Sequence, residues 1–252
     1  MYMRMVHIKV RKGELENLRE HYDKHVIPTL QEIKGCFYAG LMQSTHHPDE
    51  CISMTLWKSQ ADTEAYERGG VYQTLLQNTK PYLSESTESR IQLSEDLTLE
   101  YVPVPEEPVV ETYNVEDSDE VPTFEEGKYK TPWLRTVSLK VREGKLEEFK
   151  SIYRERAVPA LREVKGCRYV FLTQRVEKRN EVISVTIWDS KEAAESYVRS
   201  GLFHKLLESQ KHTLSELYQW KMDQQEDEQR HVATSEDLAV ETFDVLTGRS
   251  FR

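Results

Sequence analysis

Apolar and polar residues in the first half of the chain alternate with two different periods, which together predict one small α+β unit. Residues 3–10 alternate with the period of two that is typical of a strand. Between residues 14 and 33 the apolar positions recur at helical spacing, and Pro28 predicts a kink or a break near the end of this helix. The pattern then predicts strands at 37–44 and 51–57, a second helical region at 61–76 and a last strand at 109–115. This β-α-β-β-α-β order is the ferredoxin-like arrangement, an antiparallel sheet with both helices on one face.

The same pattern returns in the second half of the chain. A shift of about 131 positions places residues 137–144 on residues 6–13. With this shift, about 29 of about 72 positions from Met5 to Leu76 are identical to their counterparts, which is too many for chance. The sequence therefore predicts a duplicated domain.

The end of each copy is indicated by its last strand. Residues 240–245 match residues 110–115 with the register changed by about one position, whereas a competing match between two Ser-Glu-Asp-Leu segments needs a larger shift. The stretch that follows the first copy is acidic and lacks apolar periodicity, as expected of a solvated linker. We therefore predict a first domain at 1–116, a linker at 117–131 and a second domain at 132–252.

The open face of each predicted sheet has to be covered. A second copy on the same chain is present at high effective concentration, so it is the natural cover. We expect an α+β fold in which the two antiparallel sheets pack face to face as an intramolecular barrel. This leaves further oligomerisation open.

Composition excludes several classes of partner. The formal net charge is -10 and no cluster of Lys and Arg stands out, so nucleic acid is not expected as a partner. No stretch of about 18 apolar residues and no signal peptide is present, so we expect a cytoplasmic protein without a membrane partner. The three cysteines form no CxxC motif and are interpreted as reduced, packed thiols.

Two short motifs carry a resemblance to a known family. Gly35 precedes the predicted second strand, and Thr-Leu-Trp-Lys-Ser at 55–59 and Thr-Ile-Trp-Asp-Ser at 186–190 lead from a strand into a helix. Tandem units with these motifs resemble the antibiotic biosynthesis monooxygenase family, and the resemblance covers both copies except the linker and residues 82–108 and 212–238. It implies a barrel of two units with a small-molecule pocket between sheet and helices in each half.

The resemblance also implies a type of chemistry. Some members oxygenate phenols or quinols without metal or flavin, which requires a base, hydrogen-bond donors for the developing anion and a dry pocket. We therefore expect a cofactor-independent monooxygenase that acts on a small aromatic or quinol-like compound and carries no cofactor and no metal. A non-catalytic ligand-binding or sensing protein is the first alternative, and a haem-binding or haem-degrading enzyme is the second.

The chain departs from the family pattern at the positions that carry this chemistry. A His commonly stands nine residues after the motif Trp, and this position is occupied here by Tyr66 and Tyr197, whose phenol is a poor base at neutral pH. Relatives that degrade haem use an Asn, a Trp and a His, and none of the three is present at the corresponding positions, which are Val6 and Val137, Tyr66 and Tyr197, and Leu76 and Leu207. Haem degradation by that mechanism is therefore disfavoured.

Four residues are candidates for catalysis. Tyr66 and Tyr197 keep a hydroxyl in both copies, which serves either a ligand or the structure. His204 lies near the second helix of the second copy only, where an imidazole could exchange protons and make the two pockets unequal, and a side chain that points to solvent or fills space is the alternative. His7 lies on the first strand of the first copy, where a hydrogen bond in the barrel interior is the alternative to catalysis.

Six aromatic residues are candidates for the pocket wall, each with core packing as the alternative. They form three pairs that correspond between the copies: Trp57 and Trp188, Tyr22 and Tyr153, Tyr38 and Tyr169. His21 and His25 have the spacing of two metal ligands on one helical face, but the second copy has Ile152 and Arg156 there and no third ligand is evident. We therefore predict no metal site.

Overall fold

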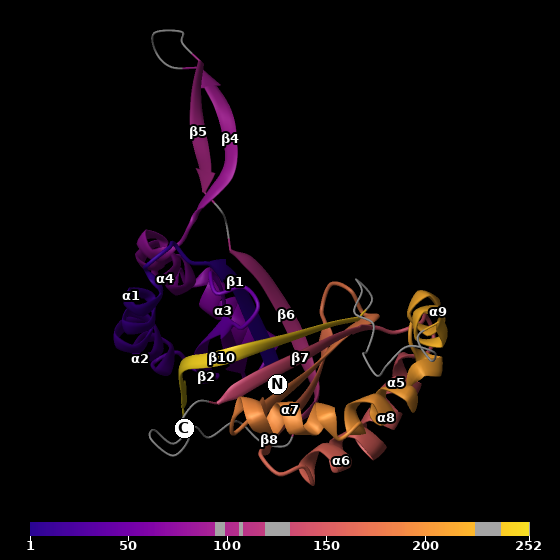
Figure 1. Ribbon diagram of the computed structural model, residues 1–252. Coiled ribbons are helices and arrows are strands. Elements are labelled where there is room, and N and C mark those ends of the chain that lie inside the picture. Colours follow the sequence, from indigo (N-terminus) through magenta and orange to yellow (C-terminus); the bar gives the residue numbers. More distant parts are fainter. Residues whose placement is uncertain (94–98, 106–107, 119–131, 225–237, 252) are drawn as a thin grey trace.

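The computed structural model describes residues 1–93, 99–105, 108–118, 132–224 and 238–251. The first copy contains the predicted order of elements (Figure 1). Its strands are β1 (Tyr2–Lys9), β2 (Cys36–Ser44), β3 (Glu50–Trp57) and β6 (Val109–Ser118). Its helices are α1 (Leu15–His21), the π-helical turn η1 (Tyr22–Val26), α2 (Ile27–Gln31), α3 (Gln60–Arg68), α4 (Val71–Thr79) and the short η2 (Lys80–Tyr82).

The second copy repeats this order. Its strands are β7 (Trp133–Lys140), β8 (Cys167–Arg175), β9 (Glu181–Trp188) and β10 (Leu238–Ser250). Its helices are α5 (Leu146–Ile152), η3 (Tyr153–Ala157), α6 (Val158–Arg162), α7 (Lys191–Arg199), α8 (Leu202–Glu208) and η4 (Lys211–Thr213). The duplication of an α+β unit is therefore confirmed in the order of the elements as well as in the sequence.

The eight long strands form one closed barrel in the order β1-β3-β2-β10-β7-β9-β8-β6. The last strand of each copy makes the closure, since it pairs first with its own copy and then with the other. β6 pairs with β1 through Tyr2 to His7 and then with β8, and β10 pairs with β7 and then with β2. A register shift accompanies each crossing, between Val115 and Asp117 in β6 and between Val245 and Thr247 in β10. The expected intramolecular barrel is thus present, and strands shared between the copies close its edges.

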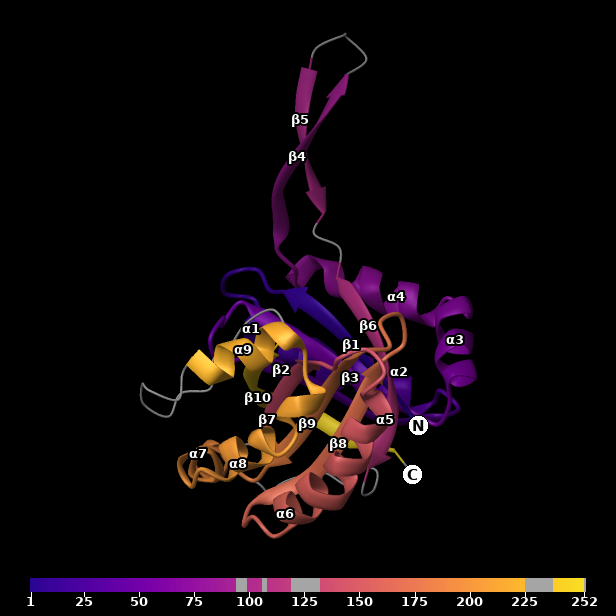
Figure 2. The same cartoon turned by 90° about the vertical axis from the view of Figure 1, so that its right-hand side faces the viewer.

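Three apolar clusters stabilise this arrangement. The barrel interior is filled from both copies, with Met3, Met5 and Met54 of the first copy packed in one cluster with Phe171 and Phe243 of the second. The other two clusters lie between the outer face of the sheet and the helices of each copy. The helices lie outside the strands in both views (Figures 1 and 2). Each copy therefore has a helix-side core, to which Phe251 of the second copy contributes in the first, while the barrel core belongs to both.

The predicted break at Pro28 takes the form of a π-helical turn. Proline has no N–H to donate, so it interrupts regular helical bonding. The N–H of Ile27 donates instead to the carbonyl of Tyr22, five residues back, and α2 continues from there. Pro159 follows an equivalent turn in the second copy. These turns begin at Tyr22 and Tyr153, two of the predicted pocket residues.

The two longer segments contain additional elements. In the first copy, β4 (Glu85–Leu93) and β5 (Leu99–Pro105) form a hairpin that projects away from the barrel (Figures 1 and 2). In the second copy, α9 (Glu216–Gln224) follows η4. β6 extends to Ser118, two residues into the predicted linker, and residues 119–131 of that linker lie outside the described residues. No helix in the described ranges is long and apolar enough to span a membrane.

Candidate functional site

A cavity of about 40 Å³ lies between the sheet and the helices of the second copy. Strands β7 and β9 form its floor, and η3, α6, α7, α8 and Gln210, which follows α8, cover it. Every lining side chain is buried or half-buried. Its polar members are Arg135, Tyr153, Ser184, Thr186, Tyr197 and Gln210, and its apolar members are Val137, Leu139, Ala157, Leu161, Phe203, Leu206 and Leu207. The cavity is therefore a small, largely apolar space on which several polar groups converge.

Two of these polar groups form a hydroxyl pair that both copies share. The Tyr153 hydroxyl and Ser184 Oγ lie 2.7 Å apart, and in the first copy the Tyr22 hydroxyl and Ser53 Oγ lie 2.9 Å apart. Each pair joins the π-helical turn to the third strand of its copy. Burial raises the pKa of Tyr22 well above its ordinary value, so this phenol is un-ionised at neutral pH, and either oxygen of the pair can be the donor.

The tyrosines expected on the second helix stack on the motif tryptophans. Tyr197 lies 5.2 Å from Trp188 and Tyr66 lies 4.9 Å from Trp57, measured between ring centroids. Burial raises the pKa of both phenols, and the arginine beside each opposes the rise without cancelling it. Neither tyrosine can therefore serve as a base at neutral pH, although Tyr197 lines the cavity and can donate a hydrogen bond there.

The motif tryptophans are completely buried. Trp57 Nε1 donates to Thr55 Oγ1 at 2.8 Å, and Trp188 Nε1 donates to Thr186 Oγ1 at 2.9 Å. Each indole thus finds a hydrogen-bond partner two residues back on its own strand. Trp188 stacks on Tyr197 and is not one of the residues that line the cavity.

A buried arginine on the first strand of each copy was missing from the sequence-based candidates. Arg4 is 2% exposed and Arg135 is 5% exposed, and the two correspond in the repeat. Arg135 lines the cavity with its guanidinium carbon 4.1 Å from the Phe203 ring centroid and 5.9 Å from that of Tyr197. Arg4 is similarly placed over Tyr72 and Tyr66, at 4.2 and 5.8 Å. The signal for these residues was a cation in the middle of an apolar strand pattern, repeated in both copies.

Several of the predicted residues lie away from this cavity, among them His204, Tyr38 and Tyr169. His204 is on the outer side of α8, where its side chain is 59% exposed and lies 4.0 Å from Glu208. Tyr38 packs in the barrel core and Tyr169 packs against that core, on the other face of the sheet. The register of β2 shifts between Cys36 and Tyr38, and that of β8 shifts between Cys167 and Tyr169. These shifts decide which residues of the two strands face the barrel interior.

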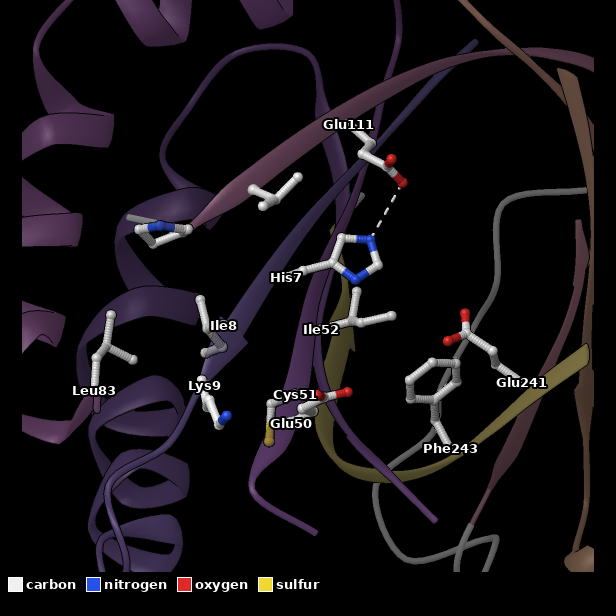
Figure 3. A pocket seen from close by; sticks show the side chains of 12 residues that line it. His7, Ile8, Lys9, Glu50, Cys51, Ile52, Leu83, Glu111, Glu241 and Phe243 are labelled. Carbon is white, nitrogen blue, oxygen red and sulfur yellow. Dashed lines mark ion pairs between the residues drawn. The ribbon is translucent and has the colours of Figure 1, made fainter. Parts of the chain in front are cut away.

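His7 belongs to a different cavity, of about 470 Å³, at the end of the barrel where β1 ends and β3 begins (Figure 3). Its Nε2 lies 3.3 Å from Glu111 Oε2, and Glu241 and Phe243 face them from the second copy. The carboxylate of Glu111 also accepts from the Tyr113 hydroxyl and pairs with Arg175 of the second copy. The pKa of Glu111 is lowered to about 2, and the largest cause is its hydrogen bond with His7. The hydrogen bond from Tyr113 and the charge of Arg175 also lower it. This cluster joins the copies, and several side chains that line its cavity are exposed.

Metal-binding groups do not gather in the described part of the chain. His21 and His25 lie with ring centroids 5.3 Å apart, and the next ring is that of Tyr82 at 5.1 Å from His21. Within the described ranges no group of three or more His, Cys, Asp or Glu side chains is placed to hold a metal ion. Burial raises the pKa of the three cysteines, to about 12 in each case, which keeps them as unreactive thiols.

Comparisons with known proteins agree with this architecture. The chain is similar in fold to a provisionally assigned monooxygenase of Lactobacillus acidophilus, with a TM-score of 0.67 and 9% identity over 99% of this chain and 95% of the other. A provisionally assigned monooxygenase of Fusobacterium nucleatum matches with a TM-score of 0.69 and 8% identity over 99% and 94%. An anthrone oxidase-like protein matches with a TM-score of 0.53 and 14% identity over 99% and 92%. Comparison with curated protein sequences gives no match.

The family is shown by a sequence model rather than by these distant structures. The model of the antibiotic biosynthesis monooxygenase family matches residues 1–77 and 134–209, one region in each copy. Both regions contain the strand, the helix and the Trp motif on which the resemblance rested. Because the two matches together cover more than half of the chain, the protein belongs to the antibiotic biosynthesis monooxygenase family, as two tandem domains on one chain.

Proposed function

We propose that the chain is a cofactor-independent monooxygenase that binds a small aromatic or quinol-like compound in the cavity of the second copy. The observation that carries the proposal is the cavity itself, whose wall combines apolar side chains with converging hydrogen-bond donors. An electron-rich substrate can pass an electron to dioxygen once it has lost a proton. One oxygen atom then enters the product and the other leaves as water, with the substrate as the source of electrons. The side chains have to stabilise the anion and exclude water.

The wall of this cavity supplies donors but no base. Its polar side chains are one guanidinium, four hydroxyls and one amide, and it contains no carboxylate, imidazole or amine. The substrate must therefore be acidic enough to ionise without a positioned base. His7 is paired with a carboxylate, but it lines the larger cavity whose wall includes exposed side chains, and that surrounding suits cofactor-free oxygenation less well.

The size of the cavity adds a requirement for entry. An engineered apolar cavity of about 150 Å³ accommodates benzene, so a space of about 40 Å³ admits water but not an aromatic ring. Phe203 at the start of α8 lies over Arg135 and partly closes the cavity. We propose that this ring turns aside when the substrate binds and that the substrate takes its place against the guanidinium.

The test is dioxygen uptake by metal-stripped protein with a panel of phenols and hydroquinones. Ala157→Val places in the second copy the residue that the first copy has at Val26, so it fills the cavity with a side chain that this fold tolerates. We expect Ala157→Val to abolish uptake and the matched variant Val26→Ala to leave it unchanged. If the parent protein consumes no dioxygen with any compound of the panel, the proposal that it is a monooxygenase is contradicted.

A non-catalytic ligand-binding protein is the second candidate, favoured by the lack of a base in the cavity wall. It predicts that aromatic compounds raise the melting temperature of the protein while dioxygen is not consumed. The same panel therefore separates the two functions in one set of samples.

A further inference from the structure

The two copies carry the same buried arginine but neutralise it differently. In the first copy, Arg4 Nε donates to Glu67 Oε1 at 3.0 Å. In the second copy the position of Glu67 is occupied by Val198, which has no charge. Among the described residues, the Arg135 guanidinium has no hydrogen bond and no ion pair, and its contacts are with the faces of Phe203 and Tyr197.

A buried cation without a counter-charge is costly. Aromatic faces offset part of that cost, but much less than a carboxylate does. Burial lowers the pKa of the Arg135 guanidinium, and an arginine nevertheless keeps its proton in proteins. Within the described part of the second copy, Arg135 is therefore a positive charge beside the cavity with no carboxylate paired to it.

The side chains around Arg135 can bind a negatively charged oxygen on an aromatic ring. Tyr197 and the hydroxyl pair of Tyr153 and Ser184 lie in the same wall and can donate to oxygen. Gln210 donates its amide to the carbonyl of Leu206 at 3.1 Å, while its Oε1 has no hydrogen-bond partner among the described residues and can accept from a ligand hydroxyl. The flat guanidinium already stacks on one aromatic ring, so it can stack on another.

We propose that the cavity of the second copy binds its ligand as an anion, with Arg135 as the counter-charge for a phenolate or carboxylate oxygen on a small aromatic ring. Glu67 occupies the equivalent place in the first copy and keeps that copy from binding anions. The inference rests on the proposed function in one respect, that the cavity accepts a small aromatic compound. It adds the charge of that compound and the residue that selects it.

The experiment uses the full chain and 4-nitrophenol, a phenol that ionises near neutral pH and whose anion absorbs visible light. Because an opposite charge at contact distance lowers the pKa of an acid by about 1 or more, we expect the ratio of phenolate to neutral phenol to be at least tenfold higher for the bound compound than for the free compound at the same pH. Val198→Glu introduces the carboxylate of the first copy, and it should reduce the affinity for the phenolate at least tenfold. Val198→Gln has the same length without the charge and should retain the affinity within about threefold.

Val198 is 43% exposed, and the Glu67 side chain at the equivalent position is 40% exposed. Substitutions of Val198 by Glu and by Gln therefore lie at the surface and leave the core unchanged. Equal losses in the two variants would overturn the proposal, because the effect would then be one of size. No loss in Val198→Glu, or no binding of the phenolate by the parent protein, would overturn it as well. Benzoate and neutral benzamide provide a second comparison, in which only benzoate should bind more weakly to Val198→Glu than to Val198→Gln.

Dioxygen uptake with a hydroquinone, measured in the same variants, separates this inference from the proposed function. Binding of the anion without uptake contradicts the oxygenase and retains the anion site. If Val198→Glu leaves dioxygen uptake unchanged, the proposed oxygenase function stands and the proposed anion site is overturned.

Discussion

Replacing Glu111 with Gln tests whether one carboxylate stabilises the contact between the two copies. Glu111 lies on β6 of the first copy and contacts His7, Tyr113 and, from the second copy, Arg175. The fall of its pKa from 4.5 to about 2 corresponds to about 3 kcal/mol of stability, at about 1.4 kcal/mol for each pKa unit. Its side chain is 16% exposed, so solvent screens part of this effect and we expect a loss of about 2 kcal/mol.

The sign of the pH dependence follows from the lowered pKa. A carboxyl group whose pKa is lowered in the folded protein contributes stability that is present above its ordinary value of 4.5 and is lost as the pH falls toward about 2. Urea unfolding of the parent and of Glu111→Gln should therefore differ most at about pH 7 and converge as the pH approaches about 2.

The repeat provides a matched control. Glu241 holds the equivalent position on β10, but serines, Ser138 and Ser44, stand at the places of His7 and Arg175. Glu241→Gln should therefore change stability by less than about 0.5 kcal/mol at any pH. Equal effects of the two substitutions, or a loss in Glu111→Gln that does not shrink in acid, would show that the Glu111 carboxylate does not stabilise the contact between the copies.

Three further substitutions test other parts of the structure. Phe203→Ala removes a buried ring over Arg135, so urea unfolding should show a loss of about 3 kcal/mol. Phenols should raise the melting temperature of this variant more than that of the parent protein, and an equal rise would contradict the proposal that Phe203 partly closes the cavity. Gly40→Ala places a methyl group against the Tyr38 hydroxyl inside the barrel and should cost about 1 to 3 kcal/mol in urea unfolding, whereas equal stability would show that the ring can move. Ser190→Ala removes the side chain that caps α7 through the Ala193 N–H and should cost about 1 kcal/mol, and a neutral result would mean that water replaces the cap.

Local periodicity was sufficient to predict the elements of each copy. A helix and a strand are specified by the spacing of apolar residues over a few turns or a few positions, and the shift of about 131 positions then repeats the prediction for the second copy. The correspondence of Tyr22 with Tyr153 and of Trp57 with Trp188 between the copies followed from the same shift, because their helices and strands have regular spacing.

The faces of irregular segments could not be predicted in this way. A one-residue register shift on β2 turns Tyr38 toward the barrel interior, since neighbouring residues of a strand point to opposite faces. His204 follows the break at Gly201, whose φ of 76° lets the chain turn between α7 and α8, and this turn decides which side of α8 faces solvent. Neither effect is visible in the spacing of apolar residues.

The repeat, the elements of each copy and the family could be predicted from the order of the residues alone. The tertiary structure decided which copy completes which sheet, because the partner of β6 beyond Val115 is a strand of the other copy and pairing between distant segments carries no local signal. It also decided the candidate site. Arg4 and Arg135 occupy equivalent positions and are both buried, and only the folded structure shows that Glu67 pairs with Arg4, at a position that is Val198 in the second copy.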